Sequence, residues 1–212
     1  MRRTARPFQC AIAGALLVPL LPSVASAHLV TTGLGPVYDG VGHLVLTVED
    51  LIPVLGLSLL AGLRGPKSAR WTLFILPLAW FIGGFCGLQA LRETTLPFQC
   101  VSFLVVGVLV ASDLELPAVC VAVLAIALGL FHGYADGSGI KDAGTSSGVL
   151  EFIGMMAALF VIVALISALV VSLRRDWTRI VVRVAGSWIA AIGLLLLGWA
   201  LHNSEPVTVF VP

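Results

Sequence analysis

The sequence predicts an all-α membrane protein, a bundle of six transmembrane helices that follows a cleaved signal peptide. Residues of the set AVILMFWYC make up 59% of the 212 residues, whereas charged residues make up only 11%. Soluble domains carry about 25% charged residues. The mean hydropathy is +1.07, and the apolar residues form long runs, which is typical of segments that cross lipid. The net charge of +1 provides no electrostatic footprint for nucleic acid.

Residues 1–27 have the three-part pattern of a secretory signal peptide. Three arginines lie within the first six residues, an apolar run covers 10–21, and small residues precede a cleavage site after Ala27. Cleavage there makes His28 the mature N-terminus, on the outer face of the membrane. The alternative is a retained first transmembrane helix, although the apolar run is shorter than the ~20 residues that a span requires.

The mature chain, 28–212, is expected to form one transmembrane domain. A helix of about 20 residues crosses a hydrocarbon core of ~30 Å. Six apolar runs are candidate spans: 43–63, 71–91, 97–112, 116–131, 148–173 and 180–202. The third and fourth runs are short for a span.

The distribution of basic residues predicts the orientation. Seven Lys and Arg residues lie in 64–70 and 174–183, against two in the segments that six spans place on the opposite side. Loops rich in Lys and Arg remain on the cytoplasmic side. We therefore expect a protein of a bacterial-type inner (plasma) membrane with both termini outside.

The four histidines fall on the outer side of this topology, and two of them have acidic neighbours. His43 follows Asp39 by four residues, and His132 precedes Asp136 by four residues. This spacing puts two side chains on one helical face, and imidazole with carboxylate suits Ni²⁺, Co²⁺, Cu²⁺ or Zn²⁺. Nearby glycines make chelation by a loop an equal alternative. The simpler interpretation is a capping Asp and a polar His at the membrane rim.

The N-terminal His28 would offer both its α-amine and its imidazole to one ion, provided that cleavage occurs. This chelate is chemically accessible because an α-amine has a pKa of about 8. The simpler interpretation is that His28 is only the residue that follows the cleavage site.

The first span carries acidic residues that are expensive in a membrane and that usually face a bundle interior or an ion path. His43, Thr47 and Asp50 follow an i, i+4, i+7 pattern, which predicts one polar stripe. Glu49, and Glu151 at the outer end of the fifth span, are further candidates for the same path. The alternative places Glu49 and Asp50 near the lipid headgroups, with the span starting after them.

These residues resemble the motifs of the HupE/UreJ family, which are small membrane proteins associated with hydrogenase and urease gene sets. The matching positions are His28, Asp39, His43, His132 and Asp136. The resemblance implies six spans and a nickel or cobalt permease. The chain departs from the family pattern where Leu29 replaces a proline, and where Tyr134 and Asp136 replace two histidines. A carboxylate in place of an imidazole makes the site harder and weakens the preference for Ni²⁺ over Mn²⁺, Co²⁺ or Zn²⁺.

The predicted function is therefore secondary transport of a divalent transition metal, with nickel as the expected ion. An outer site captures the ion, which then passes to Asp50, with Glu49 and Glu151 as possible relays; the capture residues are His28, Asp39, His43, His132 and Asp136. The sequence has no HExxH or Walker-type motif, so no enzymatic activity and no cofactor are expected.

The expected partners are the lipid bilayer and the metal ion, with no nucleic acid. Two other functions stay open. One is a non-transporting membrane subunit that binds metal or acts as a scaffold for a metalloenzyme system and its maturation proteins. The other is an intramembrane metalloenzyme that uses the same ligands with an open coordination position.

Overall fold

The computed structural model describes residues 32–89, 98–140, 145–173 and 176–203, and all regular secondary structure in these ranges is helical. The all-α prediction is confirmed. The predicted signal peptide and His28 lie outside the described residues. The helices are α2 (Pro36–Leu46), α3 (Val48–Leu63), α4 (Pro66–Leu88), α5 (Phe98–Ser112), α6 (Ala118–Ile140), α7 (Thr145–Ser172) and α8 (Asp176–Asn203).

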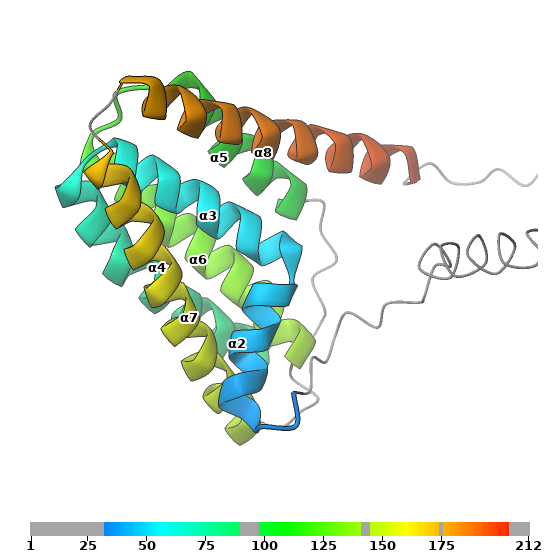
Figure 1. Cartoon of the computed structure of the whole chain (residues 1–212). Coiled ribbons are helices and arrows are strands. Elements are labelled where there is room, and N and C mark those ends of the chain that lie inside the picture. The colour runs from blue at the N-terminus through cyan, green and yellow to red at the C-terminus, as the bar shows by residue number, and fades with distance from the viewer. Residues whose placement is uncertain (1–31, 90–97, 141–144, 174–175, 204–212) are drawn as a thin grey trace, which may run out of the picture.

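The central helix of the bundle is α3, which contacts every other described helix. Helices α4, α6 and α7 lie on one side of it, and α5 pairs with α8 on the other side (Figure 1). Helix α2 packs against α7 at the end of the bundle where α3 begins. In the first turn of α3, Asp50 faces the protein interior and is buried, whereas Val48 and Glu49 are exposed.

The lengths and composition of the helices fit a membrane bundle. Four helices, α4, α6, α7 and α8, are long and apolar enough to cross a membrane, and α2 and α3 together form a fifth candidate that is bent by 74°. Helix α5 is apolar but has only 15 residues, fewer than the ~20 of a full span. The membrane fold is confirmed, and the count of six spans stays a prediction.

Helix α6 continues to Ile140, past the expected end of the span at 131. The glycines that suggested a loop are contact points instead. A Cβ at Gly133 would collide with the backbone carbonyl of Trp80, and a Cβ at Gly137 with that of Gly84. Because small residues let helix backbones approach closely, α6 packs tightly on α4 and stays helical through His132 and Asp136.

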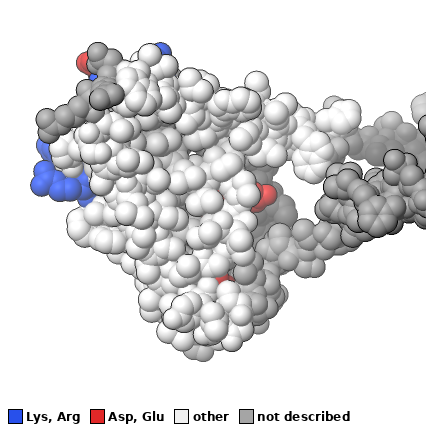
Figure 2. Space-filling model, viewed as in Figure 1, with Lys and Arg blue, Asp and Glu red and all other residues white. Residues whose placement is uncertain are grey.

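Basic side chains gather at the end of the bundle where α3 meets α4 and where α8 begins, as Figure 2 shows on the left. Arg64, the C-cap of α3, and Arg179 of α8 both donate to the carboxylate of Asp113. Arg183 donates from Nε to the carbonyl of Ala111 at 2.9 Å. This cluster fastens the C-terminal end of α3 to the pair of α5 and α8.

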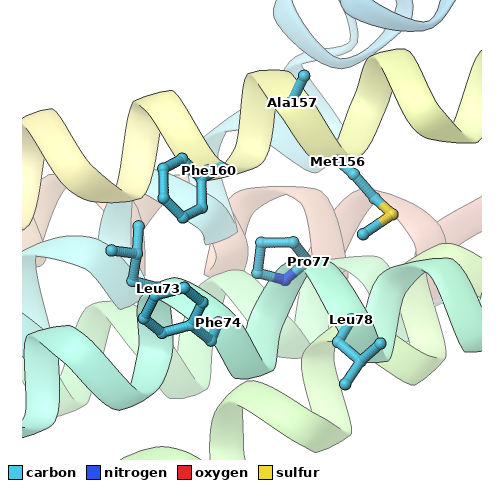
Figure 3. Close-up of a pocket in the computed structure, with 7 residues that line it drawn as sticks. All are labelled: Leu73, Phe74, Pro77, Leu78, Met156, Ala157 and Phe160. Carbon is cyan, nitrogen blue, oxygen red and sulfur yellow. The ribbon is translucent and has the colours of Figure 1, made fainter.

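An apolar pocket of about 280 Å³ lies between α4 and α7 (Figure 3). Its side chains are all apolar: Leu73, Phe74, Pro77, Leu78, Met156, Ala157 and Phe160. Because no polar or titratable side chain lines it, the pocket has no means of binding an ion. The candidate site is elsewhere, at the junction of α2 and α3.

Candidate metal centre

A break in the chain between α2 and α3 creates the candidate site. Thr47 separates α2 from α3 and has an extended backbone, with φ −84° and ψ 98°. In a straight helix, residues seven positions apart are separated by about 10.5 Å along the axis. The 74° bend instead brings His43 Nε2 to within 3.9 Å of Asp50 Oδ2. The break is thus what converts a stripe along a helix into a cluster.

Helix α6 contributes the third member of the cluster. Asp136 Oδ1 lies 3.7 Å from His43 Nε2, and one ligand atom each from His43, Asp50 and Asp136 lies within 4.8 Å of the others. All three side chains are buried. Asp50 also occupies the first turn of α3, where the helix dipole favours a negative charge.

In both Asp50 and Asp136, the carboxylate oxygen that does not approach His43 accepts a buried hydrogen bond. With Asp50 ionised, its Oδ1 accepts from His132 Nδ1 at 2.9 Å, because a carboxylate has no proton to donate. The second ring nitrogen of the neutral His132, Nε2, then accepts from the hydroxyl of Ser102 on α5 at 3.0 Å. Trp80 Nε1 on α4 donates to Asp136 Oδ2 at 2.8 Å. Four helices, α3, α4, α5 and α6, therefore fix the two carboxylates.

The electrostatics of the cluster favour a cation. Among the described ion pairs, Asp50 and Asp136 are paired with histidines, and the described arginine pairs involve Asp113 instead. Two carboxylates within 4.8 Å repel each other by about 3 kcal/mol at an effective dielectric constant of ~20. A divalent ion removes this repulsion and replaces the lost hydration of both groups.

The dimensions and chemistry of the cluster suit a first-row transition metal. One imidazole nitrogen and two carboxylate oxygens are ligands that these ions accept, at about 2.0–2.2 Å. Tetrahedral ligands at that distance are about 3.4 Å apart, so the separations of 3.7 Å and 3.9 Å between His43 Nε2 and the two carboxylate oxygens require a small inward shift. Further positions around the ion remain for water.

Of the two His and Asp pairs that the sequence predicts, both members of the α6 pair belong to the network. Only one member of the α2 pair belongs to the cluster. His132 and Asp136 both belong to the network. On α2, His43 belongs to the cluster, but Asp39 accepts from the backbone N–H and hydroxyl of Thr32 at 2.5 and 2.6 Å. Asp39 is thus not among the three grouped ligands.

The remaining acidic candidates, the last histidine and the described cysteines are not among the three grouped ligands. Glu49 is exposed, whereas Glu151 is buried on α7 and within electrostatic range of His43 and Asp39. His202 is exposed in the last turn of α8. The described cysteines, Cys86, Cys100 and Cys120, are free thiols.

Two residues of the network were not among the sequence candidates. Trp80 and Ser102 are set in long apolar runs, where a tryptophan or serine has no pattern that distinguishes it from a packing residue. For Trp80 the sequence offers only a general expectation, since a buried indole N–H usually finds a hydrogen-bond acceptor. The acceptor itself, Asp136, is 56 positions away and is found only through the packing of α4 on α6.

Comparisons with known proteins agree with the earlier resemblance. The family model described as HupE / UreJ protein matches residues 16–196. Protein HupE of Rhizobium leguminosarum bv. viciae is 27% identical over 186 residues, which cover 84% of this chain and 92% of that protein. No solved structure matches the chain significantly. Because the family model covers most of the sequence, the chain belongs to the HupE/UreJ family.

Proposed function

We propose that this protein is a secondary permease for a divalent first-row transition metal, with Ni²⁺ as the ion that the family resemblance implies. The observation that carries the proposal is the buried convergence of His43, Asp50 and Asp136. Ionisable side chains inside a membrane bundle are costly and usually mark an ion path or a proton relay.

The broken first span supports transport over permanent storage. Discontinuous helices form the ion and substrate sites of many secondary transporters, where irregular backbone lines the site. Here the break at Thr47 places the start of α3 at the cluster. Three protein ligand atoms leave the ion partly hydrated, and such an ion exchanges more readily than one in a closed structural site.

The proposed route begins at the outer side. If the basic end of the bundle faces the cytoplasm, the cluster lies towards the outer end of α3. His28 and Asp39 would then assist capture, and Glu49 and Glu151 would assist passage. An inside-negative potential of 100 mV supplies about 4.6 kcal/mol for a dication, which is twice the value for one charge. Uptake therefore needs no nucleotide.

Liposomes that contain the purified chain test the proposal. With an imposed inside-negative potential, we expect ⁶³Ni²⁺ uptake by the wild type and its loss in His43→Ala. The matched control is His202→Ala, which removes an exposed histidine from the end of α8 and should transport normally. Binding without flux would contradict the permease and favour a metal-binding or scaffolding subunit. Chelator-sensitive turnover of a reporter substrate, again without flux, would favour an intramembrane metalloenzyme.

A further inference from the structure

Each carboxylate of the cluster has one oxygen engaged by a buried donor and one oxygen directed to the ion position. The engaged oxygens are Asp50 Oδ1, bonded to His132, and Asp136 Oδ2, bonded to Trp80. The remaining oxygens, Asp50 Oδ2 and Asp136 Oδ1, are the ones that approach His43 Nε2.

The two donors are themselves firmly placed. Trp80 is 1% exposed, and its ring stacks on that of His132, with centroids 5.4 Å apart and planes at 26°. The close approach at Gly133 sets the backbone of Trp80 against α6. Ser102, 7% exposed, bonds to the far nitrogen of His132 from α5. Rotation of either carboxylate would break a buried hydrogen bond, at a cost in an apolar environment.

We propose that Trp80 and Ser102 determine the ion specificity of the site by limiting both carboxylates to one oxygen each. This inference rests on the proposed function, because it concerns the same ion. Trp80 acts on Asp136 directly, and Ser102 acts on Asp50 through His132. They are positioning residues and do not contact the ion.

The selection follows from coordination chemistry. Ca²⁺ requires six to eight oxygen ligands at about 2.3–2.6 Å and commonly takes carboxylates in bidentate form. One nitrogen and two single oxygens supply too few ligands for it. First-row transition metals accept imidazole and a small ligand number at about 2.0–2.2 Å. Releasing the second oxygen of Asp136 or Asp50 makes the site more favourable to Ca²⁺.

The test is a measurement of metal binding selectivity in the full-length purified chain. Equilibrium dialysis with ⁶³Ni²⁺, competed by Ca²⁺, gives the ratio of the two affinities. Trp80→Phe removes the indole N–H and keeps an aromatic ring on His132. We expect this variant to shift the ratio towards Ca²⁺ by about 10-fold, the lower end of the effect of residues behind a ligand on affinity. Ser102→Ala should shift it in the same direction by less, because His132 remains beside Asp50.

The packing control is Leu76→Val, one turn before Trp80 on α4. Leu76 is fully buried and apolar, so this variant loses core volume without touching a ligand. It should unfold at a lower temperature with an unchanged affinity ratio. If Trp80→Phe does not fold, Ser102→Ala, which deletes one hydroxyl, decides the question.

The outcomes separate the two proposals. A wild type that binds no transition-metal ion overturns the proposed function and this inference with it. A wild type that binds Ni²⁺, together with Trp80→Phe and Ser102→Ala variants whose affinity ratio is unchanged, overturns only the role of the two positioning residues.

Discussion

His132 and Asp50 are 82 positions apart in the sequence and are joined by a 2.9 Å hydrogen bond between Nδ1 and Oδ1. His132 is fully buried and Asp50 is 1% exposed. The bond ties the beginning of α3 to α6, close to the break between α2 and α3. Asp50 is therefore both the end of this link and a candidate ligand.

Asp50→Asn should abolish tight metal binding. The amide keeps the shape of the side chain but loses the charge that attracts a dication, and it can present its NH₂ group instead of an oxygen. Because residues behind a ligand commonly affect affinity by 10–100-fold, we expect a loss of at least about 100-fold for the ligand itself. Isothermal titration of Ni²⁺ into the purified chain measures it.

The matched control is Glu49→Gln, which removes the neighbouring carboxylate. Glu49 is exposed and should bind no ion at the cluster, so we expect the affinity to change by less than about twofold, in line with the weak effect of exposed charges. Equal losses in the two variants would contradict the assignment of Asp50 to the site and favour a general effect of negative charge.

Asp113→Asn should lower the stability of the bundle without altering metal binding. Asp113 has φ 51°, a left-handed conformation that Asn also tolerates, so the substitution isolates the charge. The Arg64 side chain is 6% exposed and loses its ionic partner, whereas Arg179 is 54% exposed and adds little. We expect a loss of about 1–3 kcal/mol, below the 3–5 kcal/mol of fully buried pairs.

Thermal unfolding in detergent measures this loss. Glu115→Gln, at an exposed position two residues later, is the control and should unfold as the wild type does. A parallel drop in Ni²⁺ affinity in Asp113→Asn would show that the two ends of α3 are coupled, which the present assignment does not predict.

Cysteine labelling in intact cells tests the orientation. In a background in which all four native cysteines are replaced by serine, Tyr38→Cys on α2 and Lys67→Cys on α4 introduce single thiols at exposed positions. The positive-inside rule predicts that Lys67 lies on the cytoplasmic side. A membrane-impermeant maleimide should label Tyr38→Cys directly and Lys67→Cys only after permeabilisation. The reverse pattern would invert the topology and the direction of the proposed uptake.

The fold class was predictable because long apolar runs are a local property of the sequence. The helix ends were less predictable, since a glycine within a helix has no local cue that separates a loop from a contact. Gly133 is the example: its missing side chain lets α6 approach α4, and the helix continues to Ile140. That information is in the neighbouring helix and not in the run itself.

The candidate site was partly predictable because helical spacing is also a local property of the sequence. Spacing identified His43, Asp50, His132 and Asp136 as polar residues with shared helical faces, and all four lie in the network. Spacing gave equal weight to Asp39, which contacts Thr32 instead. The approach of His43 to Asp50 depends on the 74° bend at Thr47, and a tertiary bend has no periodicity to detect.

Gly133→Ala should damage both packing and metal binding, because a methyl group at this position collides with the carbonyl of Trp80. Separation of α6 from α4 would also lengthen the hydrogen bond from Trp80 to Asp136, now 2.8 Å. We expect a loss of about 1–3 kcal/mol, typical of overpacking, with weaker Ni²⁺ binding. Thermal unfolding and Ni²⁺ titration of the same sample measure the two effects.

Gly139→Ala makes the same change six residues later on α6, where the added Cβ meets nothing within 4 Å. Its stability should stay the same or rise by up to about 1 kcal/mol, since alanine favours helix over glycine. Metal affinity should not change. If the two variants behave alike, helix propensity and not the contact with α4 governs this segment, and Gly133 has no part in placing Trp80 on Asp136.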